Sequence, residues 1–143
     1  MNLRDETRAW IIATEPGAMA TCSYGYAVDP IVGAASIKHL LNRVQRQAFG
    51  RRWAQVPAEY RLSAIGVWER VHRWGNTHCH VLVAGPKPVL RILRGWGAFA
   101  WEELQPRGQL HVRPIRSQDD AASYITKCLS VNPSNAYDRL FIY

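Results

Sequence analysis

The feature that most restricts the fold of this chain is an apolar run with two embedded histidines, residues 77–84 (Thr-His-Cys-His-Val-Leu-Val-Ala). Such a run predicts a β-strand. Because alternate side chains of a strand point to the same face, His78 and His80 would stand side by side, and Cys79 would point the other way. Two parallel imidazoles on a rigid strand supply half of a divalent-metal site. The alternative is a pair of ordinary strand histidines.

A second strand is predicted just upstream, over residues 62–72, and residues 73–76 (Arg-Trp-Gly-Asn) between the two runs predict a tight turn. A hairpin centred in that turn would place Glu69 directly opposite His80. Glu69, His78 and His80 would then share one face, with Cβ atoms of directly opposed residues about 5 Å apart. The hairpin therefore predicts Glu69 as the third metal ligand.

Glu69 has two competing interpretations. It can be a solvated or salt-bridged acid, although its neighbours Ile65 and Val67 make a poor environment for a carboxylate with no partner. A change of register by one residue would also move Glu69 to the other face of the hairpin. His72 is the competing ligand, although it points away from the two histidines in the proposed register.

A helix is predicted to begin near Ser117, which can cap it, while Asp119 and Asp120 suit the positive end of the helix dipole. Tyr124 and Lys127 are three residues apart and would be neighbours on one face of this helix. The alternative is core packing for Tyr124 and a solvated cation for Lys127. The combination of this pair with the two histidines is more informative than either residue alone.

The chain resembles the HUH endonuclease superfamily in two motifs, His78-Cys79-His80 and Tyr124-Ile-Thr-Lys127. The class it resembles most is that of the single-tyrosine replication initiators (Rep) of plasmids, phages and small circular DNA viruses. Residues 10–16 (Trp-Ile-Ile-Ala-Thr-Glu-Pro) resemble the weaker first Rep motif, a strand that ends in a threonine. One departure is Cys79, where a larger aliphatic residue is usual.

The resemblance implies a metal-dependent enzyme that nicks and joins single-stranded DNA at specific sequences. Tyr124 would attack the scissile phosphate and form a 5′-phosphotyrosine with a free 3′-OH, and Lys127 would assist. A hard ion, Mn²⁺ or Mg²⁺, would be held by Glu69, His78 and His80. The partner would be single-stranded DNA at a replication origin, with or without a hairpin, and the reaction would initiate rolling-circle replication.

Two alternatives remain open. The first is a single-tyrosine HUH transposase, but those enzymes usually carry a glutamine one turn after the tyrosine, where this chain has Cys128. Glu69 also favours the Rep class. The second is a non-catalytic module with an RRM-like fold, which would bind nucleic acid by stacking bases on sheet aromatics and would need no metal.

Charge and length agree with a nucleic-acid enzyme of one domain spanning residues 1–143. The formal net charge is +7, and most of the basic residues are arginines, which bind phosphates in bidentate fashion. No apolar run suggests a membrane span or a signal peptide. We therefore expect a cytoplasmic protein, or one in the host nucleus if it comes from a eukaryotic virus. The sequence does not indicate the oligomeric state.

The three cysteines should be reduced thiols, and none of them is spaced for a structural zinc site. The metal chemistry of the chain is therefore expected at the histidine pair.

Strand and helix patterns alternate along the chain and predict an α+β fold. We expect a mainly antiparallel sheet of about five strands with packed helices, the ferredoxin-like or RRM-like core of HUH domains. The predicted strands are residues 9–14, 62–72, 77–84, 109–115 and 139–143. The predicted helices are residues 34–49, 89–101 with an interruption near Gly95 and Gly97, and the segment from Ser117. Residues 16–33 are expected to be an irregular connection.

Overall fold

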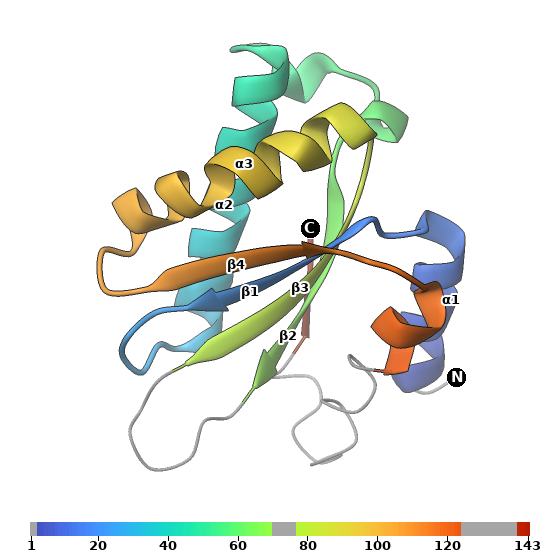
Figure 1. The fold of residues 1–143 in the computed structure, drawn as a ribbon, viewed down its shortest axis with the longest axis horizontal. Helices are drawn as coiled ribbons and strands as arrows, with labels where there is room; N and C mark the ends of the chain where they lie inside the picture. Colours follow the sequence, from blue (N-terminus) through green and yellow to red (C-terminus); the bar gives the residue numbers. More distant parts are fainter. Residues whose placement is uncertain (1–2, 70–76, 124–139) are drawn as a thin grey trace.

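The computed structural model describes residues 3–69, 77–123 and 140–143. In this part of the chain, five strands form one sheet in which every pair of neighbours is antiparallel (Figure 1). The sheet order is β4-β1-β3-β2-β5. The strands are β1 (Ala18–Ser23), β2 (Ser63–Glu69), β3 (His78–Ala84), β4 (Gln109–Pro114) and β5 (Leu140–Ile142). The predicted α+β class with a mainly antiparallel sheet is confirmed.

Three α-helices are described in full: α1 (Leu3–Thr14), α2 (Pro30–Phe49) and α3 (Lys87–Leu104). Two short 3-10 turns, η1 (Trp53–Gln55) and η2 (Ala58–Tyr60), connect α2 to β2. Residues 118–123 are also helical. No helix among these described residues is long and apolar enough to cross a membrane.

The first four strands have the order β4-β1-β3-β2, with α2 between β1 and β2 and α3 between β3 and β4. This β-α-β-β-α-β connectivity is the split βαβ arrangement of ferredoxin-like folds. α2 and α3 pack side by side on one face of the sheet (Figure 1). β5 extends the sheet beyond β2.

The core between the sheet and α2 and α3 is built around Tyr24. Its ring packs edge-on against Trp101, with ring centroids 5.1 Å apart, and its hydroxyl donates to the Gly33 carbonyl oxygen at 2.7 Å. The Trp101 indole N–H donates to the Ser23 carbonyl oxygen at 3.0 Å. Large aromatic side chains can be fully buried here because their polar atoms are hydrogen-bonded.

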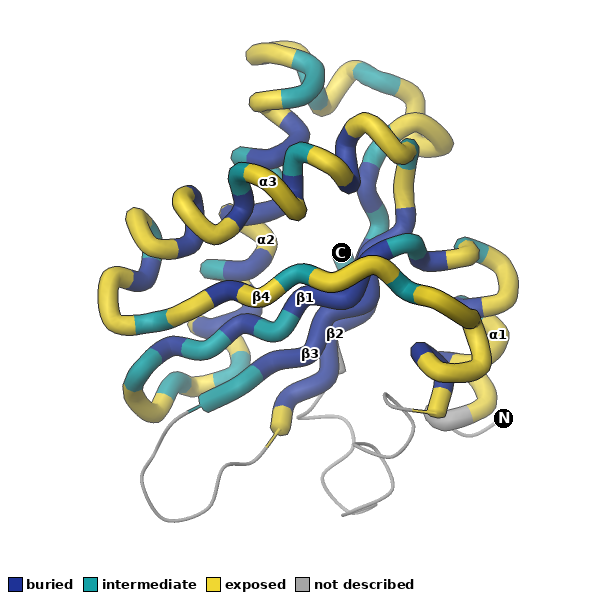
Figure 2. The backbone as a smooth tube through the Cα atoms, in the orientation of Figure 1, coloured by how far each residue is buried: buried dark blue, intermediate teal, exposed yellow. Residues whose placement is uncertain are grey.

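A second, smaller core lies on the opposite face of the sheet, under α1 and the helical residues 118–123. Its members are apolar side chains of the strands and of these two helical segments: Ile11, Met19, Ile65, Val67, Leu82, Ala121 and Ala122. The central strands are therefore covered on both faces along much of their length (Figure 2). Coverage of both faces explains why β3 is almost continuously apolar.

The strand predicted over residues 9–14 is wrong, because this segment is the second half of helix α1. Ile11 is 1% exposed and Ile12 is 73% exposed, and Thr7, four residues before Ile11, is also buried. Burial thus follows the helical period, not the alternation of a strand. Asp5 and Glu6 lie in the first turn, where acids stabilise a helix. Residues 10–14 of the segment that resembles the first Rep motif are therefore helical.

The irregular connection predicted over residues 16–33 is also wrong, since it contains β1, which pairs with β3 and β4. Its small side chains Ala18, Ala20 and Cys22 are buried against α2 and α3. They have weak strand propensity, which is why the sequence pattern missed the strand. α2 begins at Pro30, where the Asp29 carboxylate accepts from the Ile31 N–H at 2.9 Å.

The interruption predicted in α3 does not occur, because the helix runs unbroken through Gly95 and Gly97. Gly97 is buried, and a methyl group on it would lie 3.1 Å from Leu110 of β4. The glycine allows close approach of the helix to the sheet at this position. The glycine fits the tight packing against the Leu110 and Leu93 side chains and does not mark a break in the helix.

Candidate functional site

The histidine motif lies on β3, between β1 and β2 in the sheet. Cys79 is buried in the core under α2 and α3. His78 and His80 are on the opposite face, together with Leu82 of the smaller core. His80 is 4% exposed, and His78 is half-buried. The predicted alternation of the two histidines and the cysteine is confirmed.

Glu69 is the last residue of β2, and its carboxylate oxygen Oε2 lies 2.8 Å from Nε2 of His80. The register differs from the predicted one by two residues: Glu69 is opposite His78, and Val67 is opposite His80. A shift by two residues keeps every side chain on its face. The predicted direct opposition of Glu69 and His80 is therefore wrong, but the shared face is correct and the two side chains meet diagonally.

Thr21 of β1 contacts the second ring nitrogen of His80, Nδ1. It is the direct cross-strand partner of His80, and its hydroxyl Oγ1 lies 3.2 Å from His80 Nδ1. The two ring nitrogens therefore have partners on two different strands. Sequence reasoning missed Thr21 because it lies in the segment predicted to be irregular.

The polar face continues from β3 to the edge strand β4. His111 of β4 is opposite Thr21, and Gln109 is opposite Ser23, which is in turn opposite His78. The Gln109 N–H donates to the Ser23 hydroxyl at 3.0 Å. His111 and Gln109 are exposed. One end of the sheet thus presents a row of hydrogen-bonding side chains across four strands.

The distance between the Glu69 carboxylate and the His80 ring allows both side chains to bind one metal ion at adjacent coordination positions. Metal–ligand distances near 2.1 Å put adjacent ligand atoms of an octahedral ion about 3 Å apart, close to the 2.8 Å between Oε2 and Nε2. Half of the Glu69 side chain is exposed, at 49%, so its carboxylate has room to turn. No described His, Cys, Asp or Glu side chains form a group of three or more arranged to hold a metal.

The structure brings Glu69 and His80 together and places His78 on the same face, opposite Glu69. Tyr124 and Lys127 lie outside the described residues, as do the competing ligand His72 and the turn at residues 73–76.

The helix that leads to Tyr124 in the sequence begins as predicted. The Ser117 hydroxyl accepts from the Asp120 N–H at 3.1 Å, which is the contact of an N-cap residue. Ala121 and Ala122 are buried against Met19, Val67 and Leu82 on the histidine face of the sheet. The described start of this helix therefore packs on the face that carries Glu69 and His80.

No protein-family model matches this chain, and a comparison with curated proteins found no match.

Proposed function

We propose that this chain is a metal-dependent endonuclease and nucleotidyltransferase of the HUH type, which nicks and rejoins single-stranded DNA through a covalent tyrosine intermediate. Within that type we favour the replication-initiator class, which acts at an origin of rolling-circle replication. The observation that carries the proposal is the contact between Glu69 and His80 on the sheet face against which residues 118–123 pack.

The donor set supports this chemistry. Glu69, His78 and His80 would supply one oxygen and two nitrogens to an ion such as Mn²⁺ or Mg²⁺. An ion bound there would polarise the scissile phosphate and stabilise the charge that develops on it. His80 would be oriented for this role by the Thr21 hydroxyl at Nδ1.

Tyr124 is proposed as the nucleophile, because in the sequence it directly follows the Ser117-capped helical residues 118–123, which pack on the histidine face. A bond forms between its phenolic oxygen and phosphorus, and the bond from phosphorus to the 3′ oxygen breaks. The phenolic proton is transferred overall to the leaving 3′ oxygen. Lys127 would stabilise the phenolate, since a free tyrosine ionises only near pH 10. The reverse reaction would join strands.

The net charge of +7 supports a polyanionic partner. Arg113 is exposed on β4, two residues after His111 and therefore on the same face, and Arg116 is exposed just after the strand. We propose that single-stranded DNA binds along the polar row and that these arginines contact its phosphates.

A non-catalytic RRM-like module is less consistent with the side chains of this face. Such modules stack bases on aromatic residues of the central strands. On the face that carries Glu69 and His80, the residues of β1 and β3 next to the site are Thr21, Ser23, His78 and His80. None of them is a large aromatic residue. Tyr24, Trp68 and Trp101 are buried in the opposite core.

Covalent capture tests the proposal directly. The protein is incubated with a pool of random single-stranded DNA and Mn²⁺, and DNA that remains attached after SDS treatment is sequenced. We expect one preferred sequence next to the attached 5′ end. Absence of any attached DNA at protein concentrations that bind DNA would contradict the proposal. A preference for DNA sequences next to hairpins, like those at the ends of transposable DNA, would favour the transposase alternative.

A further inference from the structure

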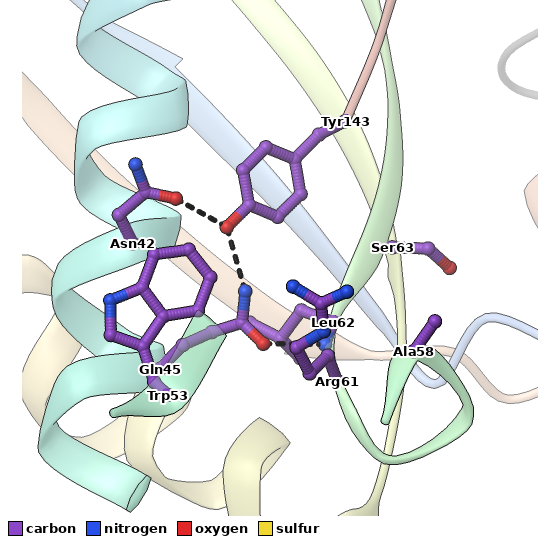
Figure 3. Close-up of a pocket in the computed structure, with 8 residues that line it drawn as sticks. All are labelled: Asn42, Gln45, Trp53, Ala58, Arg61, Leu62, Ser63 and Tyr143. Carbon is purple, nitrogen blue, oxygen red and sulfur yellow. Dashed lines mark hydrogen bonds between the residues drawn. The ribbon is translucent and has the colours of Figure 1, made fainter. Parts of the chain in front are cut away.

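A cavity of about 380 Å³ lies between the second half of α2, the two 3-10 turns and the start of β2 (Figure 3). Its polar and aromatic lining consists of Asn42, Gln45, Trp53, Arg61, Ser63 and Tyr143. Ser63 is at the opposite end of β2 from Glu69, six residues and about 20 Å along the strand. The cavity is therefore separate from the candidate metal site.

One wall of the cavity is a chain of hydrogen bonds through Tyr143 (Figure 3). The Tyr143 hydroxyl donates to Asn42 Oδ1 at 2.6 Å and accepts from Gln45 Nε2 at 2.7 Å. Gln45 Oε1 in turn accepts from the Leu62 N–H at 2.9 Å. This wall is fixed before any ligand binds, because its buried amide and the phenol already satisfy each other.

β5 holds Tyr143 in this position. Tyr143 directly follows this strand, and its backbone exchanges two hydrogen bonds with the backbone of Ala64, at 2.9 and 3.1 Å. The Phe141 ring packs over Gly66, which has no side chain to obstruct it. The wall is thus formed by helix α2 together with Tyr143, whose backbone is bonded to the sheet.

Arg61 is the residue of the cavity lining that has a buried hydrogen-bond donor without an acceptor. Its Nε atom is buried and has no hydrogen-bond partner. Among the described residues, no carboxylate forms an ion pair with its guanidinium. Arg61 as a whole is half-buried, but this one buried N–H lacks an acceptor, which is unfavourable. A guanidinium fits the oxygens of a phosphate in bidentate fashion, so an anion that enters the cavity would supply the acceptor.

Trp53 indicates a second property of the ligand, a flat ring that can stack on the indole. Its half-buried indole lines the same cavity and offers a flat apolar surface. Stacking on an aromatic face is the usual way in which proteins hold an unpaired base. The cavity volume lies within the range of about 300–1,000 Å³ that is typical of small-ligand sites.

We propose that this cavity binds one nucleotide, with its phosphate on Arg61 and its base against Trp53. The nucleotide is either free or part of a single strand, and both sources offer the same phosphate and base. This binding site goes beyond the proposed nicking activity and does not require it.

The test is calorimetric titration of the whole chain in EDTA, so that neither metal binding nor nicking contributes. The probes are dAMP, deoxyadenosine, inorganic phosphate and an eight-residue oligodeoxyadenylate. We expect saturable binding of dAMP, and weaker binding of deoxyadenosine and of phosphate. Arg61→Gln and Trp53→Leu should each weaken dAMP binding at least about tenfold. Arg51→Gln, at an exposed arginine outside the lining, should change it less than about twofold.

The oligonucleotide distinguishes the two sources. If Arg61→Gln loses affinity for dAMP and for the oligonucleotide, the cavity binds a nucleotide of a strand. If it loses affinity for dAMP alone, the cavity binds a free nucleotide. Thermal unfolding identifies variants that fail to fold, and Arg61→Lys, which keeps the charge without the planar fork, should then show intermediate affinity. Phosphate binding as tight as that of dAMP overturns the proposal. Equal losses in Arg61→Gln and Arg51→Gln, or no saturable binding of dAMP or oligonucleotide, also overturn it.

Discussion

Thr21 and His80 are direct cross-strand partners, and the threonine hydroxyl lies 3.2 Å from Nδ1 of the buried imidazole. A hydroxyl can both donate and accept a hydrogen bond, so it satisfies Nδ1 whether or not that nitrogen carries a proton. A carboxylate only accepts hydrogen bonds, so in this structure the Nε2–H of His80 donates to Glu69. A metal ion bound by both side chains would replace that proton, and the remaining proton of His80 would then lie on Nδ1, where the Thr21 hydroxyl accepts it.

Thr21→Val should weaken metal binding and nicking about 10- to 100-fold, the usual effect of removing a group that orients a metal ligand. Valine keeps the shape and loses only the hydroxyl, so the fold should survive. Thr21→Ser keeps the hydroxyl and should restore most of the affinity. Calorimetric titration with Mn²⁺ measures the effect. Equal metal affinity in Thr21→Val and the wild type would show that the hydroxyl does not position His80.

The site was predictable to the extent that it depends on strand alternation. His78, His80 and Glu69 share a face because the side-chain period of a strand is two, and an error of two residues in register does not change the face. The turn length decides which residues are directly opposite, and the sequence of residues 73–76 does not determine that length. The diagonal contact between Glu69 and His80 therefore required the structure.

His80→Ala and Glu69→Gln should abolish or severely reduce nicking while leaving DNA affinity within about twofold, because phosphate contacts by arginines dominate binding. His39→Ala is the matched control, since His39 is exposed on α2, on the opposite side of the sheet. Nicking of a labelled oligonucleotide and its binding are measured for each variant. Undiminished nicking by the wild type in EDTA would rule out the metal mechanism.

Affinity for single-stranded DNA should fall steeply with salt. A protein that neutralises about five phosphates of a single strand loses on the order of 100-fold in affinity between 50 and 200 mM salt, as counterions are released. Fluorescence anisotropy at four salt concentrations gives the slope. A flat dependence would mean that base stacking, not phosphate contact, holds the strand.

Stability should decline at alkaline pH because of Tyr24. Burial raises the pKa of this phenol well above its usual value, and the nearby Cys22, Cys79 and Tyr26 raise it further. Above about pH 10 the phenol ionises in the unfolded chain but stays protonated in the folded one. The unfolded state then binds fewer protons, and the free energy of unfolding falls as pH rises. Below pH 10 both states are protonated, so Tyr24 contributes no pH dependence.

Urea unfolding between pH 8 and 11 measures this effect. Tyr24→Phe should be less stable at pH 8, since its hydrogen bond to Gly33 is lost, by about 1 kcal/mol. Its stability should nevertheless fall less between pH 10 and 11 than that of the wild type. Equal slopes for the two proteins would exclude Tyr24 as a source of the alkaline decline.

The two elements before α2, helix α1 and strand β1, were not predictable from local pattern. Residues 9–14 are predicted to be a strand, yet they are helical: Ile11 is buried against the sheet and Ile12 is exposed. The real strand, β1, uses Ala18, Ala20 and Cys22 because α2 and α3 pack closely over it. Those small residues are selected by tertiary packing, which overrides intrinsic strand propensity.

Tyr124 should be the sole nucleophile. Wild-type protein mixed with its single-stranded DNA target and Mn²⁺ should give a stoichiometric adduct that resists SDS, with the mass of the protein plus the downstream fragment. Tyr124→Phe removes only the hydroxyl, so the fold and DNA binding should survive while the adduct disappears. Tyr60→Phe is the matched control, because Tyr60 is exposed on η2 and remote in the chain. Lys127→Ala should slow adduct formation without eliminating it, since the proposed metal ligands remain in place. Intact-mass spectrometry measures each adduct, and one that persists in Tyr124→Phe would assign the nucleophile to another residue.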